Sequence, residues 1–254
     1  SPIIIFYRIL KNKEDKKRYK EKFSITSKKR VKGKLIWFHG ASVGEILSIV
    51  PLIKNYEKNN SISQILVTSS TLSSSKVLKK FKFKKTVHQF YPIDNLFLTN
   101  KFLKFWKPCM AVFVDSEIWP CMYNNINDQK IPLILLNARI TKKTFKRWMT
   151  LRYFARSIFN KITIAYPQNL ETAQYLKILK ANNINNLGNL KFAENFEENL
   201  ERINVYLKKA FKKKKIWVAS STHRSEEVFC AKAHIQLRKK VKNLITIIIP
   251  RHIH

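Results

Sequence analysis

Short apolar runs alternate with longer amphipathic stretches along most of the chain. Six of these runs have the length and composition of buried strands: residues 34–38, 64–68, 87–91, 111–115, 132–137 and 161–165. Helices are expected between them, over residues 43–59, 68–81, 95–106 and 170–180. Strands that are apolar on both faces and separated by helices predict an α/β domain of the doubly wound type, with a parallel sheet covered on both sides.

The pattern changes after residue 191. Residues 192–214 are polar and charge-segregated, which is typical of a helical connector. Strand-like runs return at 216–220 and 244–250, with a helix expected between them at 225–241. We therefore predict a Rossmann-like N-terminal domain over residues 1–191 and a connector over 192–214. Residues 215–254 are expected to be the truncated opening of a second Rossmann-like domain, because so few elements bury little of their own faces.

The first 24 residues join an apolar stretch, SPIIIFYRIL, to a lysine-rich one. This combination predicts a membrane-proximal helix over residues 1–24 that lies on an anionic surface. The alternative is an ordinary first helix that packs on the core. The apolar stretch is too short to span a bilayer and has no signal-peptide cleavage pattern. Because the chain has no initiator methionine, we expect it to begin inside a longer reading frame.

The charge balance narrows the possible partners. Fifty Lys and Arg residues face sixteen Asp and Glu, for a formal net charge of +34. Such a surface attracts nucleic acid, anionic lipid or phosphorylated substrates, although the even spread of lysines also fits a general coding bias. No nucleic-acid partner is predicted, because neither a helix-turn-helix nor an aromatic-flanked glycine motif of RNA-binding sheets is recognisable.

No metal and no cofactor is predicted. The three cysteines, Cys109, Cys121 and Cys230, lie far apart, and no Cys or His group has the spacing of metal ligands. The odd cysteine count also gives no disulfide framework, so a reducing compartment is expected.

The segment HGASVGEIL follows the first predicted strand and contains Glu45. Ser42 and Glu45 have the spacing of a capping box, in which each side chain would bond the backbone amide of the other. The same segment lies at the carboxyl end of a strand, where open α/β sheets bind ligands. Gly40 and Gly44 would let a substrate approach the backbone there. From the residues alone, Glu45 is either a helix cap or a proton acceptor.

Other polar groups follow later strands. Glu117 stands in DSEIWP after the run at 111–115, and Arg139 follows the run at 132–137, where its guanidinium is suited to a phosphate or carboxylate. The two C-terminal strands are followed by a further set of polar residues with free backbone amides expected at the helix start: Ser221, Thr222, His223, Arg251 and His252. Their shared position at strand ends predicts one binding edge in each domain.

Seven segments resemble one known family when taken in order: HGASVGE, HQFYPID, DSEIWP, PLILLNARIT, GNLKF, WVASSTHRSEE and IIIPRH. They are similar to the Kdo transferases, the 3-deoxy-D-manno-octulosonic-acid transferases of lipopolysaccharide synthesis, and the resemblance runs from about residue 2 to the chain end. It implies a GT-B fold with two Rossmann-like halves. It also implies inverting transfer of Kdo from CMP-Kdo to the lipid A precursor lipid IVA, without a metal, at the cytoplasmic face of the cell inner membrane.

The resemblance also assigns roles to residues. Glu45 falls on the family's general base, which favours that role over the cap, and Glu117 falls on the second acid of its E-x-E-x-W-P motif. The N-terminal half would bind the acceptor through Ser42, Gly44, Glu117 and Arg139. The C-terminal half would bind the donor through Ser221, Thr222, His223, Arg251 and His252. We expect the helix N-terminus to lower the pKa of Glu45 and keep it ionised.

The sequence departs from the family pattern at a few positions. Asp115 stands where Glu is usual, Ser225 replaces a glycine, and Tyr166–Pro167 begins a stretch that differs from the usual Ala-Gln-Ser. The family also continues beyond PRHIH with most of the nucleotide-binding half. The alternative function is therefore a non-catalytic module that binds anionic glycolipid or membrane.

Overall fold

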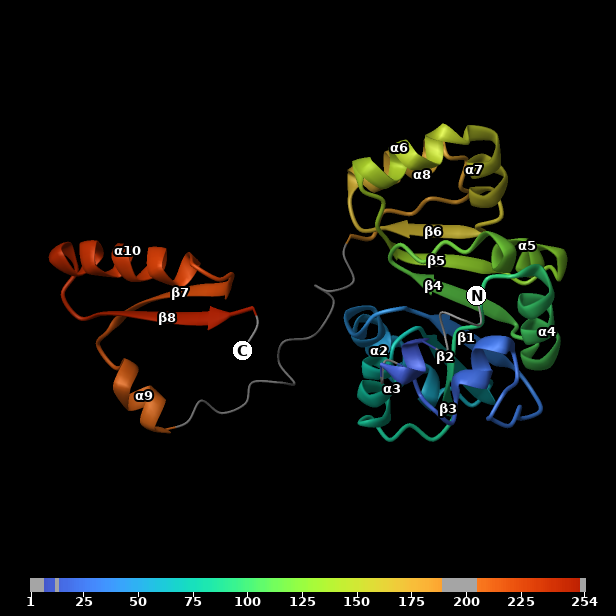
Figure 1. The fold of residues 1–254 in the computed structure, drawn as a ribbon, viewed down its shortest axis with the longest axis horizontal. Coiled ribbons are helices and arrows are strands. Elements are labelled where there is room, and N and C mark those ends of the chain that lie inside the picture. Colours follow the sequence, from blue (N-terminus) through green and yellow to red (C-terminus); the bar gives the residue numbers. More distant parts are fainter. Residues whose placement is uncertain (1–6, 12–13, 189–204, 252–254) are drawn as a thin grey trace. The chain divides into compact units, whose positions relative to one another are not determined.

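The computed structural model describes residues 7–11, 14–188 and 205–251, and it divides the chain into two compact units, Ser1–Glu194 and Asn195–His254. The first unit contains one parallel sheet with the strand order β3-β2-β1-β4-β5-β6 (Figure 1). The strands are β1 Leu35–His39, β2 Gln64–Ser69, β3 Thr86–Phe90, β4 Met110–Val114, β5 Leu133–Ala138 and β6 Ile164–Pro167. The predicted doubly wound α/β fold is confirmed.

Helices cover both faces of this sheet (Figure 1). The helices of the first unit are η1 Tyr19–Phe23, α2 Val43–Lys58, α3 Leu72–Lys79, α4 Leu96–Trp106, α5 Pro120–Asp128, α6 Lys142–Thr150, α7 Arg152–Phe159 and α8 Leu170–Ile178. Within the expected N-terminal helix, residues 7–10 are helical and η1 is a short 3-10 helix. No helix in the described part of the chain is both long and apolar enough to cross a bilayer.

Strand β1 shows why the sheet has a core on each face. Its residues alternate, so that Leu35 and Trp37 pack with α4, α5 and α7 on one side. Ile36 and Phe38 pack with α2 and α3 on the other side. All five residues of the strand are buried, as a central parallel strand requires. The two cores together hold the carboxyl ends of the strands in a fixed arrangement.

The second unit contains a pair of parallel strands, β7 Lys215–Thr222 and β8 Leu244–Pro250. Helices α9 Val205–Phe211 and α10 Glu226–Lys240 belong to the same unit. The predicted strand–helix–strand order of this region is confirmed. Most of the predicted connector, together with residue His252, lies outside the described residues.

Candidate active site

The candidate site lies at the carboxyl ends of β1 and β4. Along the chain, β1, β2 and β3 step toward one edge of the sheet, whereas β4, β5 and β6 step toward the other. The turns that follow β1 and β4 therefore diverge at this point, which is where open α/β sheets bind ligands. The turn after β1 leads to Glu45, and the turn after β4 carries Glu117.

Glu45 closes the turn that precedes helix α2. The Ser42 hydroxyl accepts a hydrogen bond from the Glu45 amide at 3.3 Å and donates one to Glu45 Oε1 at 2.8 Å. Glu45 Oε2 accepts from the Ala41 amide at 2.7 Å. The expected cap by Ser42 is confirmed, but the expected return bond to the Ser42 amide is wrong, because the carboxylate reaches one residue further back.

The environment of Glu45 raises the pKa of its carboxyl group above the ordinary value of 4.5. Burial is the largest cause, and the nearby charges of Glu117 and Asp115 act in the same direction. The bonds from Ser42 and Ala41 oppose this shift without reversing it. The expectation of a lowered pKa at this helix terminus is therefore wrong, since desolvation outweighs the hydrogen bonds that the turn provides. A carboxylate with a raised pKa is a stronger base.

Glu117 is fixed by two ring N–H groups. Its Oε2 lies 3.0 Å from His39 Nε2 and accepts from Trp119 Nε1 at 2.8 Å. Burial alone would raise the pKa of Glu117, but the hydrogen bond and charge interaction with His39 and the bond from Trp119 outweigh it, so the pKa is lowered. Glu117 is therefore an anion with a fixed position beside Glu45.

His39 links the two sides of the site and was not singled out from the sequence. It is fully buried at the end of β1, and its Nδ1 lies 2.9 Å from Thr68 Oγ1. Its ring stacks on Tyr91 with a centroid distance of 3.9 Å. The sequence feature that could have identified His39 is its position at the end of an apolar run, directly before a glycine. This position places an imidazole ring at the carboxyl edge of a central strand.

The turns after β4 and β5 are tied together. Asp115 has a left-handed backbone, and its carbonyl accepts from the Arg139 amide at 3.2 Å. The Ser116 hydroxyl donates to the Arg139 carbonyl at 2.7 Å. The Arg139 side chain is exposed. The backbone of the turn is thus held while the guanidinium remains accessible to an anion.

The two glycines of the first turn differ in their surroundings. A Cβ atom on Gly40 would lie 3.0 Å from Glu45 Cβ, so packing accounts for that glycine. A Cβ on Gly44 would meet nothing within 4 Å, and Ser42 beside it is exposed. The surface at Ser42 and Gly44 is therefore open to a ligand.

Four of the predicted donor residues are described, and Ser221, Thr222, His223 and Arg251 lie at the ends of β7 and β8. The Arg251 amide donates to the Thr222 carbonyl at 3.0 Å, which joins the two strand ends. The His223 amide donates to Glu226 Oε2 at 2.7 Å, so this amide is not free for a phosphate. The Thr222 hydroxyl donates to Glu227 at 2.8 Å, whereas the side chains of Ser221, His223 and Arg251 are exposed.

Among the described residues, no group of His, Cys, Asp or Glu side chains could hold a metal ion. The first unit thus presents two carboxylates with opposite pKa shifts, and a buried histidine contacts one of them, Glu117. Such a pair offers one proton acceptor and one fixed negative charge.

The fold is similar to that of solved nucleotide-sugar enzymes. A UDP-N-acetylglucosamine 2-epimerase matches with a TM-score of 0.60 and 16% identity, over 88% of this chain and 62% of that chain. The UDP-GlcNAc 2-epimerase from Neisseria meningitidis, bound to UDP-GlcNAc, matches with a TM-score of 0.59 and 14% identity, over 87% and 66%. At these identities the likeness concerns the fold alone, and it identifies a Rossmann-type sheet.

Residues 17–194 match the family described as "3-Deoxy-D-manno-octulosonic-acid transferase (kdotransferase)". A 3-deoxy-D-manno-octulosonic acid transferase of Rickettsia bellii is 37% identical over 251 residues, which are 98% of this chain and 60% of that protein. A probable mitochondrial member from Arabidopsis thaliana is 33% identical over 268 residues, covering 100% of this chain and 59% of that protein. The chain belongs to the Kdo transferase family and spans about 60% of the length of these relatives.

Proposed function

We propose that the protein is a glycosyltransferase that moves Kdo from CMP-Kdo to a sugar hydroxyl of lipid IVA, with inversion, in lipopolysaccharide synthesis. Family membership supports Kdo as the transferred sugar. The observation that carries the mechanism is the half-buried Glu45 carboxylate, with its raised pKa, at the diverging ends of β1 and β4. This is where a base would meet an acceptor hydroxyl.

In the proposed step, Glu45 takes the proton from the acceptor hydroxyl as its oxygen bonds to the anomeric carbon of Kdo. The bond from that carbon to the CMP phosphate oxygen breaks, and CMP leaves with the electron pair. Each oxygen of Glu45 already accepts one hydrogen bond, from Ser42 or Ala41. Each carboxylate oxygen can accept a further bond, so the capping contacts leave room for the incoming proton.

The other residues have supporting roles in this proposal. Glu117 keeps a negative charge beside Glu45 and thereby raises the pKa of the base. Arg139, Ser42 and Gly44 form the exposed surface for the acceptor, with Arg139 on a phosphate. Ser221, Thr222, His223, Arg251 and His252 are assigned to the donor, and no metal takes part.

Transfer assays with CMP-Kdo and lipid IVA, read by mass spectrometry, test this proposal. Glu45→Gln is expected to lower kcat by about 10²- to 10⁴-fold, the usual worth of a general base. Glu171→Gln is the matched control, because it also removes a carboxylate from the first turn of a helix, α8, but on an exposed side chain. The control is expected to retain full turnover.

Equal turnover by wild type and Glu45→Gln would disprove the role of Glu45 as the base. If neither protein transfers Kdo while both bind lipid IVA, the alternative of a non-catalytic glycolipid-binding module is the correct one. Lipid IVA binding, measured separately for each variant, distinguishes these two results.

We further propose that the first unit lies on the anionic surface of the inner membrane, at its cytoplasmic face. The segment of α6, Leu151 and α7 carries no acidic residue, and three of its apolar or aromatic side chains are exposed: Leu151 by 65%, Tyr153 by 88% and Phe154 by 47%. Exposed lysines and arginines accompany them. Basic helices with exposed aromatic groups bind at the boundary between headgroups and acyl chains. The segment begins three residues after Arg139, on the side assigned to the acceptor.

Sedimentation with vesicles that contain phosphatidylglycerol tests the membrane proposal. Exchange of Leu151 and Tyr153 for Gln is expected to reduce binding several-fold without unfolding, because both side chains project into solvent. The control exchanges Leu170 and Leu187, which are also exposed but lie outside the segment from Lys142 to Phe159. Equal binding by both pairs would disprove this orientation.

A further inference from the structure

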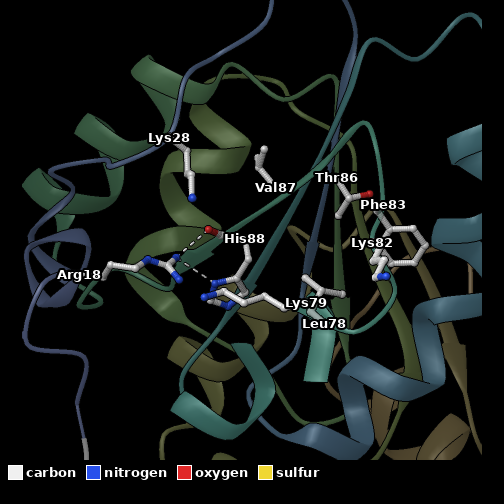
Figure 2. A pocket seen from close by; sticks show the side chains of 9 residues that line it. All are labelled: Arg18, Lys28, Leu78, Lys79, Lys82, Phe83, Thr86, Val87 and His88. Carbon is white, nitrogen blue, oxygen red and sulfur yellow. Dashed lines mark hydrogen bonds between the residues drawn. The ribbon is translucent and has the colours of Figure 1, made fainter. Parts of the chain in front are cut away.

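A cavity of about 250 Å³ lies against the edge strand β3 (Figure 2). It is formed by the N-terminal segment, the end of α3, the loop that follows α3, and β3 itself. Its lining residues, called the basic pocket below, are Arg18, Lys28, Leu78, Lys79, Lys82, Phe83, Thr86, Val87 and His88. No role in the proposed transfer reaction is assigned to any of them.

The lining contains four cationic side chains and no carboxylate. Among the described residues, the ammonium groups of Lys28, Lys79 and Lys82 make no hydrogen bond and no ion pair. Three carboxylates of the described residues contact the lining residues, and all are already occupied. Asp15 accepts from the backbone amides of Lys17 and Arg18 at 2.9 and 3.0 Å. Glu21 accepts from Arg18 at 2.8 and 2.9 Å, and Glu57 accepts from the Thr86 hydroxyl at 2.6 Å and from neighbouring amides. Three positive charges therefore converge on the cavity without a partner.

One wall of the basic pocket is rigid. Arg18 Nη2 lies 3.0 Å from His88 Nδ1 and donates to the His88 carbonyl at 2.7 Å, as drawn in Figure 2. His88 Nε2 lies 2.8 Å from Ser69 Oγ, so its ring has a partner on each side. Burial, followed by the charges of Arg18, Lys28 and Lys79, lowers the pKa of His88 to about 3. The histidine is thus neutral at ordinary pH and adds no charge to the pocket.

The basic pocket is separate from the candidate active site. It uses Thr86, Val87 and His88, the first three residues of β3, whereas the active-site turns follow the last residues of β1 and β4. In the strand order, β2 lies between β3 and β1, and β4 lies beyond β1. A ligand in the basic pocket therefore does not contact Glu45 or Glu117.

We propose that the basic pocket is a second anion site, which binds a phosphate monoester or diphosphate whose adjoining part is small and apolar. Compact ammonium groups bind phosphate oxygens as point charges, and three of them here are available. Leu78, Phe83 and Val87 offer an apolar surface beside these charges. The shared chemistry is the phosphate, which either a soluble ester or a lipid headgroup can supply.

The test compares two pairs of substitutions that remove the same charge. Lys79→Gln with Lys82→Gln alters the lining, whereas Lys76→Gln with Lys80→Gln alters exposed lysines of the same region that do not line the pocket. Binding of inorganic pyrophosphate is measured by calorimetry at constant ionic strength. Binding to vesicles with and without phosphatidic acid is measured in parallel. The matched charge is essential because the net charge of +34 attracts any anion.

The lining pair is expected to weaken binding by about tenfold or more, because hydrogen bonds to charged groups are the strong ones. The control pair is expected to change it less than about twofold, as screened surface charges do. Loss in the pyrophosphate arm identifies a soluble ester, and loss in the phosphatidic acid arm identifies a lipid headgroup. Equal effects of both pairs in both arms would overturn the proposal. Thermal unfolding of the wild type and both double variants excludes misfolding as the cause.

Discussion

The turn after β1 and the turn after β4 each bring a partly buried carboxylate to the same edge of the sheet, yet the pKa values of the two carboxylates shift in opposite directions. Glu45 is held by one hydroxyl and one backbone amide, and burial raises its pKa. Glu117 is held by two ring N–H groups, which lower its pKa despite burial. The number of carboxylates at an edge therefore says little about their chemistry, whereas the donors around each one decide which can accept a proton.

Of the substitutions at these two turns, removal of the Glu117 carboxylate is expected to have the largest effect on stability. Glu117→Ala leaves His39 Nε2 and Trp119 Nε1 without an acceptor, and it is expected to lower the free energy of unfolding by about 1–3 kcal/mol. The lowered pKa of Glu117 means that its charge stabilises the fold above the unfolded pKa. This contribution is lost as the pH falls through the folded pKa, below 4.5. Denaturant unfolding at several pH values should show the difference from wild type shrinking in acid.

Glu117→Gln separates the contribution of Glu117 to stability from the effect of its negative charge on Glu45. Its amide oxygen can accept from both ring N–H groups, so most of the stability should return. The negative charge is gone, however, and the pKa of Glu45 should fall, because Glu117 contributes to raising it. The acid limb of kcat/KM should then move to lower pH. An acid limb that does not move would mean that the charge of Glu117 does not affect the pKa of Glu45.

A smaller effect is expected at the turn of Glu45 itself. Ser42→Ala removes the cap and should cost about 1 kcal/mol of stability. It also removes a hydrogen bond that lowers the pKa of Glu45. If Glu45 is the base, as proposed, kcat/KM falls as the pH drops through a pKa above 4.5, and this limb should move to higher pH in the variant.

Asn169→Ala provides the control for Ser42→Ala. Asn169 caps α8 by accepting from the Thr172 amide at 2.8 Å, so its loss should cost a similar amount of stability. The pH dependence of kcat/KM should remain that of the wild type. If both cap variants shift the acid limb alike, the Ser42 bond has no specific effect on Glu45.

The alternation of apolar runs and helices was sufficient to predict the parallel sheet, because buried strands are apolar on both faces. Strand β6 begins at Ile164 rather than at residue 161. The amides of residues 160–162 bond back to α7 carbonyls and extend its last turn. Helices α6 and α7 were not assigned from the sequence, although both are amphipathic, because at nine and eight residues each is shorter than the pattern that identifies a helix with ease.

At the candidate site, residue types and spacing were sufficient to predict the Ser42 cap and to place Glu45 and Glu117 at one edge. They did not give the pKa direction of Glu45, because burial arises from the packing of separate elements. The pairing of His39 with Glu117 was also hidden, since 78 positions separate the two residues. The prediction of a free His223 amide was wrong, because this amide donates a hydrogen bond to Glu226, three residues later.

The central position of β1 also has a consequence for how the chain folds. Ile36 pairs with Ile65, 29 residues along, and with Met110, 74 residues along. The longer closure costs only about 0.8 kcal/mol more chain entropy, because this cost grows with the logarithm of loop length. The turn that carries Glu45 needs only the pairing of β1 with β2, which closes the shorter loop. The approach of Glu117 also needs the pairing of β1 with β4, which closes the longer one. A nascent chain can thus complete the turn of Glu45 before β4, which leads to Glu117, has been synthesised.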